Sequence, residues 1–272
     1  MKITLCTKVT NDLTLEETAA VAAESGYWGL EIFGFEEHLP PTTPLKRVEE
    51  LARLLDDLGL GVNVLATYVG PYDAASDEEM QQHLEDTRTY CRFADILGAD
   101  YVRQGTGRVS PPDATDEQWE RTAQGLRAAA EVCAEFGKSI VLETHANQLV
   151  ETADSTLKLI GMVDRPNVKV TWDPSNHHCG GFDYGPTAAH KLAEFIVNVH
   201  VKDVANDRTQ TLLGEGDVDW ASVMRGLEEI GYDGHTGVEC HAAKTEQMGG
   251  AEIAAIEIAT LRKYLEDGPP AK

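Results

Sequence analysis

The chain has 272 residues, enough for one large domain, and 46 acidic side chains against 23 lysines and arginines give it a formal net charge of −23. A surface with this charge repels polyanions over long range, so neither nucleic acid nor an anionic membrane is expected as a partner. The same charge favours a neutral or cationic ligand, although a local basic patch would escape the average.

Short β-branched segments alternate with longer amphipathic ones along the chain, which is typical of repeated βα units and a parallel sheet. Eight strands are predicted, at residues 3–6, 28–33, 62–66, 101–103, 139–143, 168–173, 196–201 and 235–239, with helices between them. Eight units without a linker favour a closed (β/α)8 barrel over an open sheet. An open sheet would usually carry a glycine-rich nucleotide-binding turn after its first strand, and the sequence has none there.

Local signals mark where several helices begin and end. Capping boxes, which satisfy two backbone donors at a helix start, are predicted at Thr14-x-x-Glu17, Ser76-x-x-Glu79 and Thr115-x-x-Gln118. Glycines that end a helix in the left-handed conformation are predicted at Gly26, Gly59, Gly98, Gly137 and Gly231. We therefore expect a single barrel domain over residues 1–267 and a disordered tail over residues 268–272.

The amino-terminal apolar stretch is too short for a signal peptide, and no later segment approaches the ~18 apolar residues of a membrane span. A cytoplasmic protein is therefore expected. The five cysteines are scattered without C-x-x-C spacing, which indicates neither a disulfide framework nor a zinc knuckle. Most of them are expected to be buried thiols.

Four of the predicted strands end on a side chain of a type that ligates metals, namely Glu143, Asp173, His200 and Glu239. Because the carboxyl ends of barrel strands converge on one cavity, these four side chains are expected to surround one divalent ion. Any one of them alone would more often be structural, for example as a helix cap. Three carboxylates buried together need a cation, however, because their mutual repulsion would raise their pKa values.

A site of three carboxylates and one imidazole is rich in hard oxygen ligands. It favours Mn²⁺, with Mg²⁺, Co²⁺ or Zn²⁺ as alternatives, and it leaves coordination positions free for substrate oxygens. A metal bound to a carbonyl and its neighbouring hydroxyl stabilises the enediolate that forms when the α-proton leaves. The pattern therefore predicts a catalytic metal centre.

Six short segments, in their order and spacing, carry a resemblance to a known family: Gly29-Leu30-Glu31, Leu142-Glu143, Trp172-Asp173-Pro174, His200-Val201-Lys202-Asp203, Gly214 to Trp220, and Val238-Glu239. The chain resembles the sugar isomerase and epimerase family with a xylose isomerase-like barrel (AP endonuclease family 2). That family includes tagatose-type epimerases, inosose dehydratases and the endonuclease IV group. The resemblance covers nearly the whole chain.

This resemblance implies that Glu143, Asp173, His200 and Glu239 are the metal ligands. It also implies that Glu143 and Glu239 double as the acid/base pair of an epimerase. One carboxylate would remove the α-proton of a ketose or keto-polyol, and the other would return a proton on the opposite face.

Two cationic or titratable side chains follow ligands at a spacing of two residues. His145 follows Glu143 and Lys202 follows His200, so alternation along a strand places each on the same face as the ligand before it. His145 is a candidate general base, or a group that orients Glu143. Lys202 is expected either to polarise a substrate oxygen or to form a salt bridge with Asp203 or Glu215.

Several further residues are candidates for contact with substrate. Glu31, which ends a strand, is expected to bind a sugar hydroxyl or to hold Lys202, and Trp172 to offer an apolar face to a sugar ring. Arg103 and His241 are additional cavity candidates.

The resemblance also exposes two departures. Tagatose-type epimerases place a histidine three residues after the sixth-strand aspartate, where this chain has Asn176 followed by His177 and His178. His177 is favoured as the cavity residue, with a surface imidazole as the alternative. Those epimerases also carry an arginine shortly after the seventh-strand histidine, and Arg208 is its nearest counterpart here.

The expected function is a metal-dependent isomerase or epimerase acting on a small sugar or polyol. A lyase that shares the α-proton step, such as one acting on an inosose, dehydroshikimate or a 3-keto-glycoside, is the alternative. A separate acid such as His145 would favour elimination, whereas the glutamate pair favours epimerisation. A nuclease is disfavoured by the charge, and a non-catalytic binding protein would not need two acid/base carboxylates. The acidic composition mildly favours an uncharged substrate, and the resemblance implies a homodimer or homotetramer.

Overall fold

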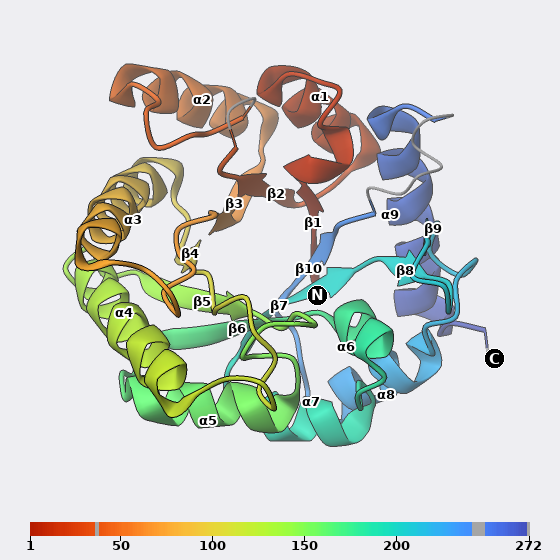
Figure 1. Ribbon diagram of the computed structural model, residues 1–272. Coiled ribbons are helices and arrows are strands. Elements are labelled where there is room, and N and C mark those ends of the chain that lie inside the picture. The colour runs from red at the N-terminus through yellow and green to blue at the C-terminus, as the bar shows by residue number, and fades with distance from the viewer. Residues whose placement is uncertain (36–37, 241–247, 271–272) are drawn as a thin grey trace.

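The computed structural model describes residues 1–35, 38–240 and 248–270. Eight parallel strands close into a barrel, and the helices form a ring around it (Figure 1). Around the barrel the strand order is β1, β10, β7, β6, β5, β4, β3 and β2, and β2 pairs with β1 to close it. The barrel strands are β1 (Lys2–Cys6), β2 (Gly29–Phe33), β3 (Gly61–Ala66), β4 (Tyr101–Arg103), β5 (Ser139–Glu143), β6 (Val168–Trp172), β7 (Ile196–Val201) and β10 (His235–Val238).

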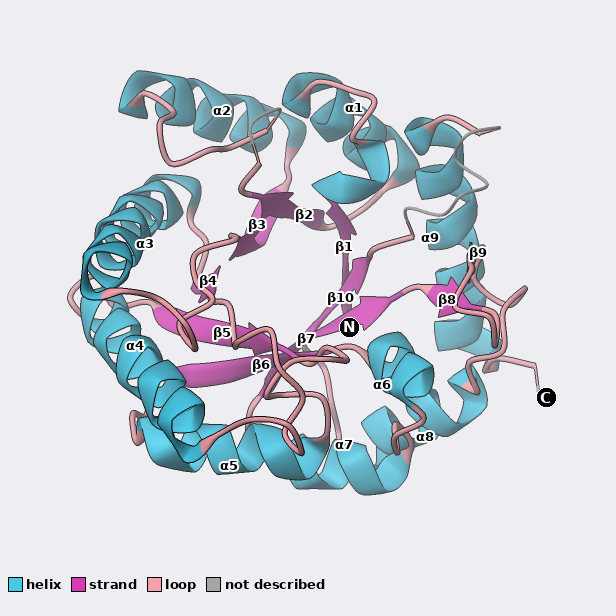
Figure 2. Ribbon diagram, in the orientation of Figure 1, coloured by secondary structure: helices cyan, strands magenta, loops and turns pink. Residues whose placement is uncertain are grey.

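Helices follow the strands and cover their outer faces (Figure 2). They are the short 3-10 helix η1 (Thr7–Thr10) and the α-helices α1 (Leu15–Ser25), α2 (Leu45–Leu58), α3 (Asp77–Leu97), α4 (Asp116–Ala134), α5 (Ala153–Val163), α6 (Pro174–Gly180), α7 (Pro186–Leu192), α8 (Trp220–Glu229) and α9 (Gly250–Asp267). An antiparallel pair, β8 (Asp203–Val204) and β9 (Gln210–Thr211), forms a separate sheet after β7.

The predicted (β/α)8 barrel is confirmed, and every barrel strand lies within one residue of its predicted bounds. The sixth strand ends at Trp172 and not at Asp173, because Asp173 is the N-cap of α6 and its side chain accepts a hydrogen bond from Asn176 N. The last helix ends at Asp267. Residues 268–270 follow it without helix or strand, and residues 271–272 of the expected tail lie outside the described residues.

The local signals for helix boundaries are also confirmed. All three predicted capping boxes are present, and all five predicted glycines have a positive φ. A fourth capping box, between Thr152 and Ser155, was not predicted because serine replaces the usual Glu or Gln at its third helical position.

The barrel interior is not purely apolar. Asn198, His200 and Lys202 alternate along or directly after β7, and all three point inward to bond other buried side chains. Relative to β6, β7 has one extra residue just before Asn198. This residue determines which side chains at the end of β7 point into the barrel. Asn63 Nδ2 donates to Asn198 Oδ1 across the barrel at 3.2 Å, and Asn198 Nδ2 donates to Glu31 Oε2 at 2.9 Å. A series of hydrogen-bonded polar side chains therefore runs through the interior to the mouth of the barrel.

No helix within the described ranges is long and apolar enough to cross a membrane. The five cysteines are free thiols, and four of them are buried, as expected.

The capping box of α4 yields a prediction about stability. Thr115→Ala removes the side-chain oxygen that accepts from Gln118 N, so the free energy of unfolding should fall by about 1 kcal/mol. Urea denaturation monitored by circular dichroism measures this change. Thr115→Ser keeps the oxygen and should lie within a few tenths of a kcal/mol of the wild type. Equal losses in both variants would contradict the role of the cap.

Candidate metal centre

The four strand-end side chains converge as the sequence predicts. Glu143, Asp173, His200 and Glu239 each offer one ligand atom, and these atoms all lie within 4.8 Å of one another. We call these four residues the ligand cluster. His200 Nδ1 lies 3.3 Å from Glu143 Oε1, 3.6 Å from Asp173 Oδ2 and 3.3 Å from Glu239 Oε2. The three carboxylates thus surround one ring nitrogen.

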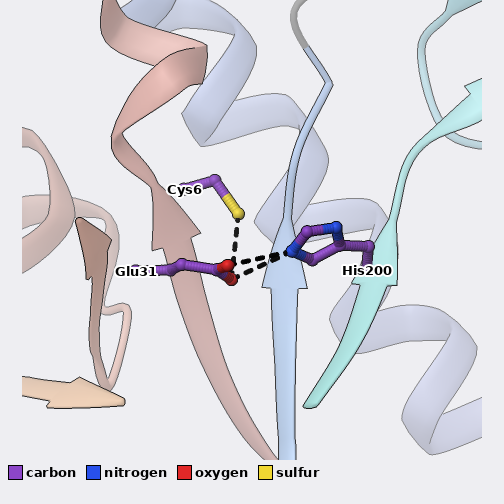
Figure 3. A group of neighbouring side chains, drawn as sticks. All are labelled: Cys6, Glu31 and His200. Atoms are coloured by element: carbon purple, nitrogen blue, oxygen red, sulfur yellow. Dashed lines mark hydrogen bonds and ion pairs between the residues drawn. The ribbon is translucent and has the colours of Figure 1, made fainter. Parts of the chain in front are cut away.

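A second group of buried side chains lies on the other side of the His200 ring (Figure 3). His200 Nε2 is 3.0 and 3.1 Å from the two carboxylate oxygens of Glu31, and Cys6 Sγ donates to Glu31 Oε2 at 3.4 Å. Gly237 makes room for this group, because a Cβ there would lie 2.7 Å from Glu31 Oε2. Since a carboxylate accepts hydrogen bonds, Nε2 carries the proton and Nδ1 faces the ligand cluster.

The residues present fit a divalent cation. His200 Nδ1 is buried and makes no hydrogen bond with any part of the chain that the structure describes. Its lone pair points at three carboxylate oxygens, and Thr144 Oγ1 accepts from Asp173 N at 2.8 Å to hold one of those carboxylates in place. An orphaned nitrogen together with hard oxygen donors is a suitable ligand set for Mn²⁺ or Zn²⁺, and the outer carboxylate on His200 is typical of such sites.

Two cationic side chains neutralise the carboxylates, in pairings that the sequence analysis did not predict. Arg103 Nη1 forms an ion pair with Glu143 Oε2 at 2.5 Å, and Lys202 Nζ lies 2.7 Å from both Asp173 Oδ2 and Glu239 Oε2. Burial alone would raise the pKa of Glu143 and of Glu239, but the neighbouring cations outweigh it and lower both pKa values. These cations therefore overcompensate the repulsion among the carboxylates, which would raise the pKa values in the absence of a cation.

The pKa of His200 is shifted upward, in the opposite direction to the pKa values of the two glutamates. Burial would lower the pKa of His200, but the carboxylates of Glu31, Glu239 and Glu143 raise it well above its ordinary value. A proton on Nδ1 therefore compensates the ligand cluster where no metal does so. A divalent ion would compete with that proton, because a ligating imidazole must be neutral.

The cluster opens into a cavity of about 370 Å³ at the mouth of the barrel. Glu143 and Glu239 line it, together with side chains from the segments that follow β1, β3, β4, β5, β6 and β7. Other polar, cationic and aromatic side chains of the lining are Lys8, Tyr68, Arg103, Arg108, His145, Asn176, Lys202 and Arg208.

Besides Glu143 and Glu239, three of the predicted substrate or catalytic residues line the cavity. They are His145, Lys202 and Arg208. The salt bridges of Lys202 run to Asp173 and Glu239 of the ligand cluster, where Asp203 or Glu215 was expected.

Three other predicted substrate contacts are corrected by the structure. Glu31 is fully buried and bonded to His200 and Asn198, so it orients a ligand and neither lines the cavity nor holds Lys202. Trp172 is fully buried and does not line the cavity, whereas the next residue, Asp173, belongs to the ligand cluster. His177 is also fully buried, and neither it nor His178 lines the cavity. His241 lies outside the described residues.

The functional position after Asp173 is the one that departs from the epimerase pattern. Asn176 lines the cavity, and its Nδ2 donates to Asp173 Oδ2 at 2.9 Å and to Thr144 O at 3.1 Å. Sequence reasoning noted this position only as a missing histidine. Tyr68, which the sequence suggested as an apolar face for a sugar ring, also lines the cavity. Lys8 and Arg108 were not recognised as cationic cavity residues, and their signal was only their place shortly after β1 and β4.

Metal affinity should depend on the buried partner of His200. Glu31→Gln removes the charge that orients the ring, so the affinity for Mn²⁺ should fall by roughly 10–100-fold. Isothermal titration calorimetry on protein first stripped with EDTA measures this change. Glu257→Gln is the matched control, because Glu257 is a fully buried glutamate outside the ligand cluster. An unchanged affinity in Glu31→Gln would remove Glu31 from the metal centre.

The burial of His177 predicts a pH dependence of stability. Burial lowers the pKa of His177 to about 4, whereas the unfolded chain protonates it near the ordinary value of 6.5. The neutral ring therefore favours the folded state above pH 6.5, and this contribution is lost as the pH falls towards 4. The loss should reach about 3 kcal/mol in metal-free protein.

Urea denaturation between those two pH values tests this prediction in wild type and His177→Leu, both in EDTA. The variant lacks the titrating ring, so its stability should depend less on pH than that of the wild type. Parallel curves for the two proteins would show that His177 does not contribute.

Comparison with known proteins agrees with this architecture. The chain is 24% identical over 257 residues to an inosose dehydratase of Geobacillus kaustophilus (strain HTA426), covering 83% of this chain and 80% of that protein. It is 24% identical over 208 residues to a 3-dehydroshikimate dehydratase of Bacillus anthracis, covering 76% and 73%.

Two solved structures show the same fold. The IolI protein with a bound zinc atom superposes with a TM-score of 0.86 at 18% identity, covering 98% of this chain and 99% of that one. An L-ribulose 3-epimerase superposes with a TM-score of 0.80 at 22% identity, covering 98% and 96%. A family model described as xylose isomerase-like TIM barrel matches residues 19–264. The chain therefore belongs to the xylose isomerase-like TIM barrel family.

Proposed function

We propose that this protein is a divalent-metal-dependent lyase, a dehydratase that acts on a small hydroxylated ketone derived from a sugar or polyol. The enzyme removes the proton α to the carbonyl and expels the β-hydroxyl group as water. Two dehydratases are among its relatives, and the ligand cluster fits the metal that such chemistry uses. The observation that carries the proposal is the position of His145 in the cavity and the tautomer of its ring.

His145 lines the cavity, and the backbone fixes the tautomer of its neutral ring. Its Nδ1 lies 2.7 Å from Ala146 O, and a carbonyl oxygen can only accept, so Nδ1 carries the proton in the neutral ring. Nε2 is then the basic nitrogen. Because His145 lines the same cavity as Glu143 and Glu239, it is placed to take a proton from a substrate bound there.

The two glutamates are less suited to exchange protons with substrate. Glu143 is held by Arg103 and Glu239 by Lys202, and protonation of either carboxylate would break an ion pair in a buried site. In epimerisation, one glutamate removes the α-proton and the other returns a proton on the opposite face, so one of the two must be protonated at each stage. One-base elimination through His145 needs neither.

The elimination balances with the residues present. His145 Nε2 takes the α-proton, the electron pair of the C–H bond forms a carbon–carbon double bond, and the bond to the β-hydroxyl breaks. The imidazolium of His145 returns the proton to the departing hydroxyl, so one water is released. A divalent ion in the ligand cluster supplies the Lewis acid that stabilises negative charge on the carbonyl oxygen. Lys202 and Asn176 line the cavity beside the cluster and orient the substrate oxygens.

Epimerisation is the second candidate function. It is favoured by a specific observation, which is that both Glu143 and Glu239 line the cavity. The likeness to an L-ribulose 3-epimerase agrees with it at the level of the fold.

Proton NMR in D₂O distinguishes the two functions. Mn²⁺-loaded protein is incubated with ketoses, inososes and 3-dehydroshikimate, the Mn²⁺ is removed, and each product is identified by NMR and mass. We expect exchange of the α-proton with loss of one water. A product of unchanged composition would identify an epimerase, and no exchange with any compound would contradict both functions.

Substitution of the proposed base gives the corresponding prediction. His145→Gln should lower kcat by roughly 10²–10⁴-fold, because it removes the base, and should leave Mn²⁺ affinity unchanged. Steady-state kinetics and calorimetry measure the two quantities. His190→Gln, at an exposed histidine paired with Glu229, is the control and should retain full activity. If Glu239→Gln abolished proton exchange while His145→Gln did not, the glutamate pair would be the acid/base system.

A further inference from the structure

The cavity is locally basic although the chain is strongly acidic. Five of its lining side chains are cationic against two that are carboxylates. The whole chain has the reverse balance, with 46 acidic and 23 basic side chains. The cationic residues of the cavity are Lys8, Arg103, Arg108, Lys202 and Arg208.

Two of these cations are used by the ligand cluster, since Arg103 pairs with Glu143, and Lys202 with Asp173 and Glu239. The other three differ. Within the described ranges, no carboxylate oxygen lies within 4.0 Å of a side-chain nitrogen of Lys8, Arg108 or Arg208. A bound metal would make the cavity more positive still.

The segment that carries Arg108 is held in a defined position. Asp73 Oδ2 accepts a hydrogen bond from Arg108 N at 3.2 Å. Just before it, Gly105 packs backbone against backbone on the segment after β3, where Gly105 N donates to Val69 O at 2.7 Å. A Cβ on Gly105 would lie 3.1 Å from that same oxygen. The wall of the cavity at Arg108 is therefore built by close backbone contact.

Arg208 is placed by an unusual backbone conformation. It lies between β8 and β9 with φ of 70°, in the left-handed region that favours glycine or asparagine. Arg208 N donates to Ala205 O at 2.8 Å, which closes the turn. An arginine at such a position costs backbone energy, and such strain is concentrated at functional sites.

Lys8 reaches the cavity from the segment after β1. Its Nζ lies 5.6 Å from the centroid of the Phe33 ring, so the ammonium group faces an aromatic ring. Within the described chain it has no carboxylate partner. The three free cations thus come from the segments after β1, β4 and β8, around the mouth of one cavity.

We propose that the substrate of this cavity is an anion, a hydroxylated ketone that carries a carboxylate or a phosphate group, and that Lys8, Arg108 and Arg208 bind that group. The inference rests on the proposed function for the ketone, but the anion subsite is argued from these three side chains alone. It replaces the expectation of an uncharged substrate, which followed from the average charge of the chain. Arg108 and Arg208 are exposed at the mouth of the cavity, so their attraction for an anion is expected to weaken as the salt concentration rises.

Matched pairs of compounds test the proposal on the Mn²⁺-loaded protein. One pair is 3-dehydroshikimate and its primary carboxamide, which differ by one negative charge. The other is D-fructose 6-phosphate and D-fructose. Isothermal titration calorimetry at about 50 mM and about 300 mM NaCl measures each dissociation constant. We expect the anionic member of at least one pair to bind at least about tenfold more tightly at low salt, with a smaller ratio at high salt.

The pair that shows this preference identifies the group as a carboxylate or a phosphate. Equal binding of both members in both pairs, or no binding of any compound, would overturn the proposal.

Charge-removing variants assign the preference to the three residues. Lys8→Gln, Arg108→Gln and Arg208→Gln should each reduce the ratio of anionic to neutral affinity by about threefold to tenfold and leave the neutral member unchanged. Arg53→Gln removes an exposed arginine of α2 outside the cavity and should leave the ratio as in the wild type. A ratio that falls in Arg53→Gln as much as in the other three would overturn the assignment, because it would report the overall charge.

Failure of this inference and failure of the proposed function give different results. Exchange of deuterium into a neutral ketone, with no preference for anions, would leave the lyase and remove the anion subsite. A preference for anions that depends on Arg108 and Arg208, with no exchange into any ketone, would keep the subsite and contradict the lyase.

Discussion

Four buried carboxylates share one end of the barrel, and the other polar groups of the site are arranged around the cost of burying them. Glu143, Asp173 and Glu239 meet at one point, and Glu31 lies behind His200. Buried charges are tolerated only where partners replace water. Arg103 and Lys202 supply permanent partners, and the His200 ring joins the two groups of carboxylates. A divalent ion would balance the remaining negative charge of the ligand cluster, which in metal-free protein is balanced by the proton on His200.

That arrangement depends on the phase of one strand. Asn198, His200 and Lys202 occupy alternate positions at the end of β7, so one row of side chains supports Glu31, holds the ligand cluster and pairs with its carboxylates. A shift of β7 by one residue would turn all three outward. The extra residue of β7 before Asn198 is therefore part of the site, as is Gly237, whose lack of a side chain leaves space for Glu31.

Charge is distributed unevenly between the surface and the cavity. The formal charge of −23 describes the chain as a whole, whereas the cavity concentrates arginines and lysines beside the ligand cluster. An average over the sequence predicts long-range repulsion of large polyanions. It does not describe the potential within a cavity, where a few nearby groups and low-dielectric walls dominate. The preference for a neutral ligand was inferred from the average charge, which does not describe the charges that line the cavity.

The sequence by itself determined the barrel and the ligand cluster. Alternating βα units specify the strands within one residue, and Glu143, Asp173, His200 and Glu239 could be found because topology carries every strand end to one place. Only the tertiary structure decided the contacts between strands that are distant in the chain. The pairing of Arg103 with Glu143, the burial of Glu31 against His200 and the removal of His177 from the cavity depend on side-chain direction across the barrel. Spacing along a single strand indicates which of its side chains share a face, but not which side chains of other strands they contact.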